Sequence, residues 1–496
     1  MAILEEPIKG VPKIKNYVDG EWIESKGEGM DVVNPLTCET IAQVGISTRE
    51  EMDDAIQAAK EAYVDWRRTP PVARCRYLFR LAQLLEENFE ELSRIQTQEH
   101  GKTIDESRGE TRRGIENVEV ACGIPTLMQG DSAEDIVSGI DEYLMRVPLG
   151  VFGIISPFNF PFMIPLWSAP YAVATGNTVV IKPTEQCPIS QSRLAELVDE
   201  AGFPPGVWNV VHGAKSVVNG MLEHPDIVGV TFVGSTPTGR DVVYPKCGAT
   251  GKRSIVQCGA SNMMVVMPDC NVRGTVPALM TSFFGNAGQR CLAGQNLIVV
   301  GEDDGFYNEF MDAVTATARG IIIGNGLDES VQMGPVKDAQ KKESVLSYID
   351  SALKDGATLR LDGREPNVVG GYPDTCFLGP TIMENISPDM KVVTEEIFGP
   401  TMGVIRVKDL DEAIQICNDN PYHNADAIFT SSGKDARKFQ YEVNCGNIGI
   451  NIGIVAPMAF FPFSGMSGSF YGILHTQGKE AVRFFTESKV CIHRWI

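Results

Sequence analysis

The chain has 496 residues, of which 43% are hydrophobic and 22% charged, a composition typical of a globular protein with two or three domains. Its formal net charge of −21, without clusters of Lys and Arg, argues against a nucleic-acid partner. The twelve cysteines are scattered singly, with no Cys-x-x-Cys pair and no Cys/His cluster. This pattern indicates a reducing compartment, no disulfide framework and no metal centre.

The first residues are acidic where a secretory signal has a basic start and an apolar core, so the expected location is the cytoplasm. Residues 147–181 carry no Asp, Glu, Lys or Arg and are numerous enough to cross a bilayer. Five prolines and three glycines interrupt them, however. We therefore predict a buried strand, an irregular loop and a buried helix, and no membrane partner.

Helical and strand patterns alternate along the chain, which predicts an α/β fold. Apolar residues recur at helical spacing in 50–66, 76–95 and 192–202, the last ending at Gly202. Short apolar stretches beside Gly or Pro predict buried strands at 150–156, 177–183, 207–213 and 228–235. Strand–helix–strand units of this kind are typical of a nucleotide-binding sheet. A second α/β series begins near residue 263 and runs to about 445, which places a domain boundary near 260.

Three short motifs contain residue types that carry chemistry, and each also has an ordinary structural explanation. The turn "GSTPTG" (234–239) follows a strand and offers free N–H groups to a phosphate, although such turns are common. Asn159, in the proline-rich "SPFNFPF", can aim its amide at an oxyanion or form an Asx-turn. Cys291 is either a core thiol or a nucleophile whose pKa is lowered by the adjacent Arg290.

The order and spacing of five motifs resemble the aldehyde dehydrogenase family. They are "SPFNFP", "KPTE" (182–185), "FVGS" (232–235), "GQRC" (288–291) and "EEIFGP" (395–400). The resemblance extends from "YVDGEW" near the start to "ESKV" near the end, and it is strongest to the methylmalonate-semialdehyde dehydrogenase branch. It implies an NAD-binding Rossmann-type domain (1–129 and 150–259), an α/β catalytic domain (260–459), and a small β oligomerisation arm with a C-terminal tail (130–149 and 460–496). A homodimer or homotetramer is the expected assembly.

The resemblance also implies roles for single residues. Cys291 would add to an aldehyde carbon, while Asn159 and the backbone N–H of Cys291 hold the resulting oxyanion. Hydride transfer to a nicotinamide would then leave a thioester. Contacts with the cofactor are expected from Phe158, Lys182, Glu185, Ser235, Glu396 and Phe398. The carboxylate of Glu185 suits a free ribose 2′-hydroxyl, which favours NAD over NADP.

Gln257 stands where most of the family has a Glu that activates water to hydrolyse the thioester. An amide cannot accept a proton from water, so the resemblance favours coenzyme A as the acyl acceptor. The alternatives are another carboxylate acting as the base, or an alignment displaced by one residue. Arg290 and Arg113 are expected to bind a substrate carboxylate. Arg112, next to Arg113, is the alternative residue for the second of these positions. One of the two arginines would otherwise bind the phosphates of the coenzyme.

The leading hypothesis is therefore an NAD-dependent, coenzyme A-acylating dehydrogenase of methylmalonate or malonate semialdehyde, forming propionyl-CoA or acetyl-CoA with loss of CO₂. A hydrolytic aldehyde dehydrogenase that releases a free acid is the alternative. A cofactor-free thiol hydrolase and a catalytically inactive binding protein are further alternatives, disfavoured by "KPTE" and by the intact Cys291, Asn159 and Glu396. Met466, Ser467 and His423 depart from the branch pattern, so succinate semialdehyde also remains a candidate substrate.

Overall fold

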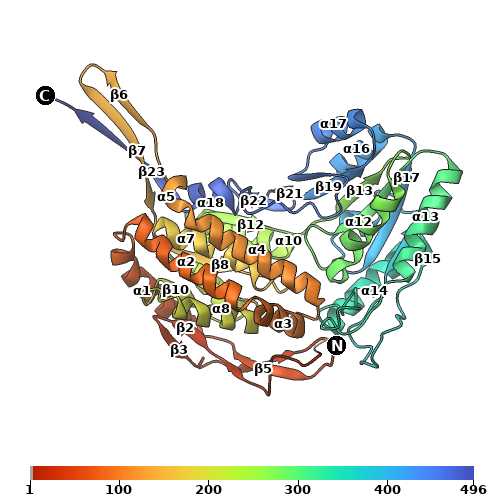
Figure 1. The fold of residues 1–496 in the computed structure, drawn as a ribbon, viewed down its shortest axis with the longest axis horizontal. Helices are drawn as coiled ribbons and strands as arrows, with labels where there is room; N and C mark the ends of the chain where they lie inside the picture. Colours follow the sequence, from red (N-terminus) through yellow and green to blue (C-terminus); the bar gives the residue numbers. More distant parts are fainter. Residues whose placement is uncertain (1–3) are drawn as a thin grey trace.

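Two large sheets, each covered by helices, lie side by side in the computed structural model, which describes residues 4–496 (Figure 1). The first has eight strands in the order β22-β12-β11-β8-β9-β10-β2-β3. Its five central strands run parallel. They are β8 (Val151–Ile155), β9 (Thr178–Lys182), β10 (Trp208–Val210), β11 (Ile227–Val233) and β12 (Arg253–Gln257). The predicted α/β fold is confirmed, and the four strands predicted at 150–156, 177–183, 207–213 and 228–235 correspond to β8, β9, β10 and β11.

The strand order of the first sheet determines where a ligand can bind. From β8 the chain builds outward through β9 and β10, then returns to place β11 and β12 on the other side of β8. The direction of winding therefore reverses between β8 and β11. In open α/β sheets, ligands bind beyond the carboxyl ends of the strands at such a reversal.

Helices pack on both faces of this sheet. They are α1 (Arg49–Trp66), α2 (Pro71–Glu87), α3 (Phe89–His100), α4 (Ile104–Cys122), α5 (Ile124–Leu127), α8 (Ile189–Glu200), α9 (Lys215–Glu223), α10 (Thr236–Thr238), α11 (Tyr244–Ala249) and α18 (Gly478–Phe484), with a π-helical turn at Gly239–Val243. The prediction of a single helix over 76–95 is wrong at one point, because the helix is interrupted at Asn88, between α2 and α3. The Asn88 side chain donates to the carbonyl of Leu84 at 2.8 Å and so ends α2. Gly202, with φ +81°, follows the end of α8 as predicted.

The second sheet has seven strands in the order β15-β16-β17-β14-β13-β19-β20, of which β15 alone runs antiparallel to its neighbour. They are β13 (Asn262–Val266), β14 (Gly294–Val300), β15 (Thr358–Leu361), β16 (Thr381–Glu384), β17 (Thr401–Val407), β19 (Ala425–Phe429) and β20 (Asn447–Ile450). The helices of this part are α12 (Val272–Phe284), α13 (Asp304–Arg319), α14 (Ala339–Lys354), α15 (Lys391–Thr394), α16 (Leu410–Asp419) and α17 (Gly433–Glu442).

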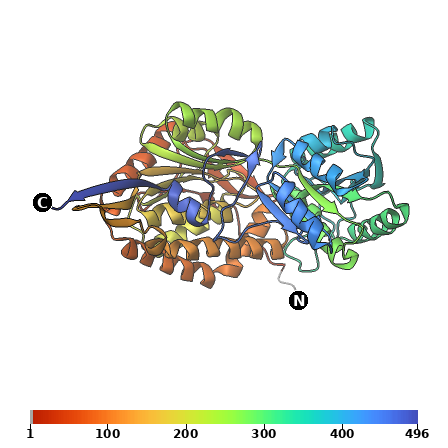
Figure 2. The same ribbon diagram turned by 90° about the horizontal axis from the view of Figure 1, so that it is seen from above.

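A three-stranded arm projects from the end of the molecule opposite the second sheet (Figures 1 and 2). It consists of β6 (Ser132–Val137), β7 (Ile140–Pro148) and β23 (Thr486–Arg494). Before reaching the arm, the C-terminal segment adds β22 (Phe470–Gly472) to the edge of the first sheet beside β12. The small strands are β1 (Lys13–Ile14), β2 (Asn16–Val18), β3 (Glu21–Ile23), β4 (Gly29–Val33), β5 (Thr40–Gly45), β18 (Tyr422–His423) and β21 (Met466–Ser467).

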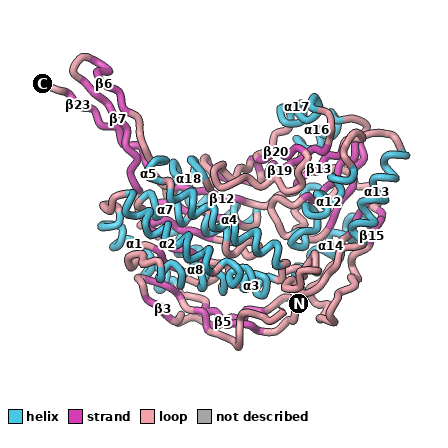
Figure 3. The backbone as a smooth tube through the Cα atoms, viewed as in Figure 1, coloured by secondary structure: helices cyan, strands magenta, loops and turns pink. Residues whose placement is uncertain are grey.

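The uncharged segment 147–181 lies mostly in the core and continues from β8 through a loop to two short helices, of which the second packs against α2 and α4 (Figure 3). These are α6 (Met163–Leu166) and α7 (Ala169–Thr175). The predicted strand, loop and helix are therefore present, with the helix split in two. Within residues 4–496, no helix has the length and apolar character needed to cross a membrane.

Candidate active site

A cavity of about 690 Å³ lies at the carboxyl ends of β8, β9 and β11, where the first sheet faces the second. Its lining includes eight of the ten site residues predicted from the sequence: Phe158, Asn159, Lys182, Glu185, Ser235, Cys291, Glu396 and Phe398. The fold therefore brings together residues that are up to 240 positions apart. Arg113 and Arg290 lie outside this lining.

Cys291 stands at the end of a tightly constrained loop between α12 and β14. Two residues just before it, Asn286 and Ala287, have left-handed backbone conformations, with φ of +51° and +50°. After the turn, the carbonyl of Cys291 accepts hydrogen bonds from the side-chain amides of Asn262 at 2.8 Å and Asn424 at 2.9 Å. The main chain at the thiol is thus fixed from two sides.

Cys291 is 8% exposed, and burial raises the pKa of its thiol to about 12. The nearby Glu396 carboxylate adds to this rise. The backbone N–H groups of Cys291 and Leu292 and, to a smaller extent, Arg290 lower the pKa without reversing the shift. Arg290 therefore does not activate the thiol by itself, contrary to one hypothesis from the sequence, and the resting thiol is protonated at neutral pH.

Asn159 lies on the loop that follows β8 and is 4% exposed. Its side-chain amide donates to the carbonyl of Gln289 at 3.1 Å, so it bonds to the Cys291 loop and not within a local Asx-turn. Its own carbonyl accepts from the Lys102 ammonium at 2.6 Å. Asn159 and Cys291 thus line one cavity from two loops that are hydrogen-bonded to each other.

The remaining lining residues form two groups. At the end of β9, Lys182 forms an ion pair with Glu185, with 2.6 Å between Nζ and Oε2. On the side of the second sheet, Glu396 accepts a hydrogen bond from the Ala260 N–H at 3.0 Å, and burial raises its pKa to about 7. A Cβ on Gly259 would lie 2.4 Å from Glu396 Oε2, so a larger residue at position 259 would displace the Glu396 carboxylate.

Two aromatic rings of the lining lie beside each other. The Phe158 and Phe398 centroids are 6.0 Å apart in an edge-to-face arrangement, and His100 stacks on Phe158 at 5.8 Å. Phe398 adopts a left-handed backbone conformation with φ +57°. Backbone strain at a residue without glycine's freedom is typical of functional sites.

The three arginines considered from the sequence have different partners. Arg112 pairs with Glu86 on the surface of α4, which excludes it from the site. Arg113 is half-buried and donates to the carbonyl of Pro457 at 2.6 Å. Arg290, with a side chain 11% exposed, donates to Glu106 at 2.8 Å. A substrate carboxylate at Arg290 would therefore have to share the guanidinium with Glu106.

Gln257 ends β12 and is 2% exposed. Its side chain donates to Asn424 Oδ1 at 3.3 Å, and Asn424 in turn donates to the Cys291 carbonyl. The position expected from the resemblance to carry a general base thus holds an amide that is connected through Asn424 to the Cys291 loop. His423 hydrogen-bonds to Ser467 at 2.7 Å, in the small sheet of β18 and β21.

Comparison with known proteins agrees with this geometry. The family model described as "Aldehyde dehydrogenase family" matches residues 22–491. The chain belongs to the aldehyde dehydrogenase family. It is 47% identical to malonate-semialdehyde dehydrogenase 2 of Geobacillus kaustophilus over 98% of this chain and 99% of that protein. It is 46% identical to malonate-semialdehyde dehydrogenase of Halalkalibacterium halodurans over 97% and 98% of the two chains.

Among solved structures, the methylmalonate-semialdehyde dehydrogenase of Oceanimonas doudoroffii superposes with a TM-score of 0.95 at 38% identity, covering 98% of this chain and 99% of the other. A Sinorhizobium meliloti protein, provisionally given the same activity and solved with NAD, has a TM-score of 0.95 at 37% identity, again covering 98% and 99%.

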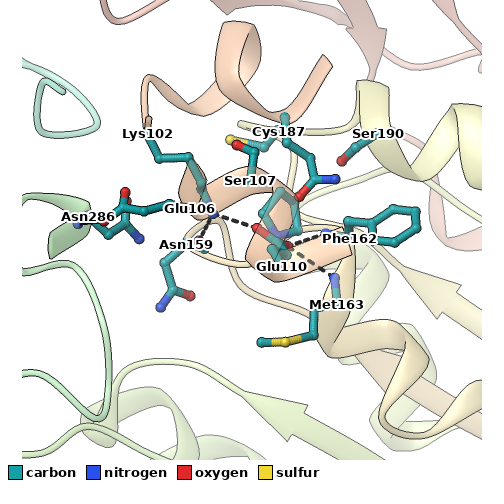
Figure 4. A network of polar contacts seen from close by, with 12 residues as sticks. Lys102, Glu106, Ser107, Glu110, Asn159, Phe162, Met163, Cys187, Ser190 and Asn286 are labelled. Carbon is teal, nitrogen blue, oxygen red and sulfur yellow. Dashed lines mark hydrogen bonds and ion pairs between the residues drawn. The ribbon is translucent and has the colours of Figure 1, made fainter. Parts of the chain in front are cut away.

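This aldehyde dehydrogenase also contains functional candidates that the sequence did not suggest. Lys337 and Lys341 line the cavity beside the predicted aromatic residues, with Lys337 Nζ 4.9 Å from the Phe158 ring centroid. Lys102 and Glu110 form a fully buried ion pair behind Asn159 (Figure 4). Lone lysines and glutamates in helical stretches normally indicate solvated surface, so the sequence offered no signal for these residues.

Proposed function

We propose that this enzyme oxidises a short semialdehyde that carries a carboxylate, using NAD, and transfers the acyl group from Cys291 to coenzyme A. Malonate or methylmalonate semialdehyde is the proposed substrate, since relatives of nearly equal length are named for these activities. One observation supports transfer to coenzyme A over hydrolysis. Position 257, where most of the family has a carboxylate that activates water, holds the amide of Gln257, which is hydrogen-bonded to Asn424.

The residues of the cavity fit NAD. It lies at the winding reversal of a parallel sheet, and the Glu185 carboxylate on β9's loop suits a ribose diol, with Lys182 beside it. Ser235 would lie at the pyrophosphate, and Phe158, Glu396 and Phe398 at the nicotinamide half. When bound, NAD supplies the hydride acceptor and a positive ring charge that favours the Cys291 thiolate.

The reaction begins when the Cys291 thiol loses its proton to water and Sγ adds to the aldehyde carbon. The Asn159 amide and the backbone N–H of Cys291 would donate to the oxyanion. Loss of hydride leaves a thioester on Cys291. The Gln257 amide cannot take a proton from water, so water is a poor acceptor of the acyl group. The coenzyme A thiol is a better nucleophile; its attack transfers the acyl group to coenzyme A and restores the Cys291 thiol.

When the substrate carries a β-carboxylate, the overall reaction includes the loss of CO₂. Malonate semialdehyde, NAD⁺ and coenzyme A give acetyl-CoA, CO₂ and NADH, and methylmalonate semialdehyde gives propionyl-CoA. Arg113 and Arg290 are the proposed carboxylate contacts. Arg113 has guanidinium donors beyond the one that binds Pro457, whereas Arg290 would share its charge with Glu106.

The assembly and location are also proposals. The apolar side chains exposed on the arm, Ile136, Val137, Val490, Ile492 and Trp495, suit burial in a homodimer or homotetramer. We propose the division into NAD-binding (1–129 and 150–259), catalytic (260–459) and arm and tail regions (130–149 and 460–496). The separation of the two large sheets supports it, with β22 crossing from the tail to the first sheet. We propose the cytoplasm as the location.

The test follows NADH formation with malonate semialdehyde and with methylmalonate semialdehyde, each with and without coenzyme A, and identifies the product by mass spectrometry. We expect coenzyme A-dependent turnover to acetyl-CoA and propionyl-CoA. Equal rates of free-acid formation without coenzyme A would favour the hydrolytic alternative. A Cys291→Ala protein that retained activity would refute the mechanism altogether.

A further inference from the structure

The beginning of helix α4 contacts both loops that carry the proposed oxyanion donors. Glu106 and Glu110 are four residues apart on this helix and so lie on the same side of it. Lys102 precedes the N-cap residue Thr103. Figure 4 shows Glu106 on the side of Asn286, and Lys102 and Glu110 beside Asn159 and the Phe162–Met163 segment.

Glu110 and Lys102 hold the Asn159 loop. Both side chains are 0% exposed, and their charged groups are 2.5 Å apart. The Lys102 ammonium also donates to the carbonyl of Asn159 at 2.6 Å. The second oxygen of Glu110 accepts from the backbone N–H groups of Phe162 and Met163 at 2.9 and 3.0 Å. The pair therefore binds this loop on both sides of its Phe160-Pro161 segment.

Glu106 holds the Cys291 loop. One carboxylate oxygen accepts from the Asn286 N–H, at the residue with φ +51°, and from the Arg290 guanidinium at 2.8 Å. These two contacts flank the left-handed turn that leads to Cys291. A short segment of chain, from Lys102 to Glu110, thus sets the positions of both loops.

Stability alone does not explain a fully buried ion pair. Desolvation of the two charges commonly cancels their attraction, and apolar replacements are often equally stable. A catalytic donor, by contrast, has to be held to within about half an ångström of its productive position. Charge-assisted hydrogen bonds to the main chain of a loop provide such restraint.

We propose that Lys102, Glu106 and Glu110 are positioning residues that set the oxyanion-binding geometry between the Asn159 amide and the Cys291 N–H. This inference rests on the proposed function, because it assumes that Cys291 forms tetrahedral adducts. It predicts that loss of these residues impairs reactions that pass through an oxyanion more than reactions of the same thiol that do not.

Two reactions of Cys291 make that distinction. Acylation by 4-nitrophenyl acetate forms a tetrahedral oxyanion and releases nitrophenolate. Alkylation by iodoacetamide displaces iodide and forms no oxyanion. Both rates are measured at one pH without NAD or semialdehyde, and mass spectrometry of the Cys291 peptide confirms the site. The ratio of acylation to alkylation cancels changes in thiol pKa and access.

The main variant is the double replacement Lys102→Met with Glu110→Gln, which removes both charges and leaves neither unpaired. Its ratio should fall ~10- to 100-fold, the range expected for a displaced oxyanion donor. Glu106→Gln, which keeps an acceptor for Asn286 but loses the charge facing Arg290, should lower the ratio less. The matched control is Arg112→Gln on the surface of the same helix, whose ratio should equal that of the unsubstituted enzyme.

A ratio that is unchanged in the double variant, or a fall of equal size in acylation and alkylation, would show a merely structural role and overturn the inference. If the double variant does not fold, as judged by its melting curve, Glu106→Gln decides by the same criterion. An unsubstituted Cys291 that alkylates but never acylates would contradict the proposed function itself, and the inference with it.

Discussion

Gln257 donates a hydrogen bond to Asn424 at 3.3 Å, and this contact fixes which way the Asn424 amide points. With its oxygen turned to Gln257, Asn424 directs its N–H₂ group to the Cys291 carbonyl at 2.9 Å. A carboxylate at position 257 has no proton to donate at neutral pH. The amide therefore supports the Cys291 loop, and under the proposed function it leaves this position without a general base.

Replacement of Gln257 by Glu should allow water to hydrolyse part of the thioester formed on Cys291. A positioned general base contributes ~10²- to 10⁴-fold in rate. Because the Asn424 contact is lost, we expect the lower end of that range, a rise of ~10²-fold in free acid formed without coenzyme A. Coenzyme A-dependent turnover should fall at the same time. The measurement is the ratio of free acid to acyl-CoA by mass spectrometry.

Gln257→Met is the matched control for this change, since it loses the hydrogen bond to Asn424 without gaining a base. It should lower coenzyme A-dependent turnover while leaving hydrolysis as slow as in the unsubstituted enzyme. Equal hydrolysis by the Glu and Met variants would show that position 257 does not face the thioester.

The pH dependence of Cys291 reactivity follows from its pKa of about 12. Only the thiolate is alkylated, so in the absence of NAD the rate at Cys291 should rise ~10-fold per pH unit from pH 8 to 10 without a plateau. Measured by mass spectrometry of the Cys291 peptide after iodoacetamide treatment, a plateau near pH 8 would contradict the buried, unassisted thiol.

Glu396 adds a second feature to the same profile. Its pKa is raised to about 7 by burial, so it is largely neutral at pH 6 and charged at pH 9. The charged carboxylate disfavours the nearby thiolate. Glu396→Gln should therefore alkylate faster than the unsubstituted enzyme at pH 9 and at an equal rate at pH 6. The opposite order at pH 9 would show that Glu396 assists deprotonation of the thiol.

The sequence predicted four strands of the first sheet, β8, β9, β10 and β11, because each is a short apolar run beside Gly or Pro, a pattern that local chemistry determines. It did not predict the break at Asn88, which depends on one side chain reaching back to Leu84. The placement of Cys291 and Asn159 in one cavity followed only from the order of five motifs. The partner of Arg290 could not be predicted from the sequence, because Glu106 lies 184 positions away and only the packing of α4 brings the two side chains together.

Arg113 should determine selectivity for substrates with a carboxylate. Replacement by Met keeps the length of the side chain and removes the charge, so KM for malonate semialdehyde should rise ~10-fold or more, in line with loss of a charge-assisted contact. KM for propanal, which has no carboxylate, should change little. Arg112→Met is the control, because Arg112 pairs with Glu86 at the surface. Equal increases in KM for the two aldehydes would assign Arg113 to the support of the Pro457 segment instead.

The arm should lose its capacity for assembly when charge is placed on its apolar side chains. Val490 and Ile492, both on β23, are 58% and 65% exposed. Because neighbouring side chains on a strand alternate between faces, residues 490 and 492 lie on the same face. The double replacement Val490→Lys with Ile492→Lys should therefore shift the molecular mass measured by light scattering towards the monomer, since a buried interface cannot accommodate two unpaired charges. Lys489→Glu, on the other face of β23, is the control and should keep the assembly of the unsubstituted enzyme. An unchanged mass in the double variant would locate the subunit contact elsewhere than on this face of the arm.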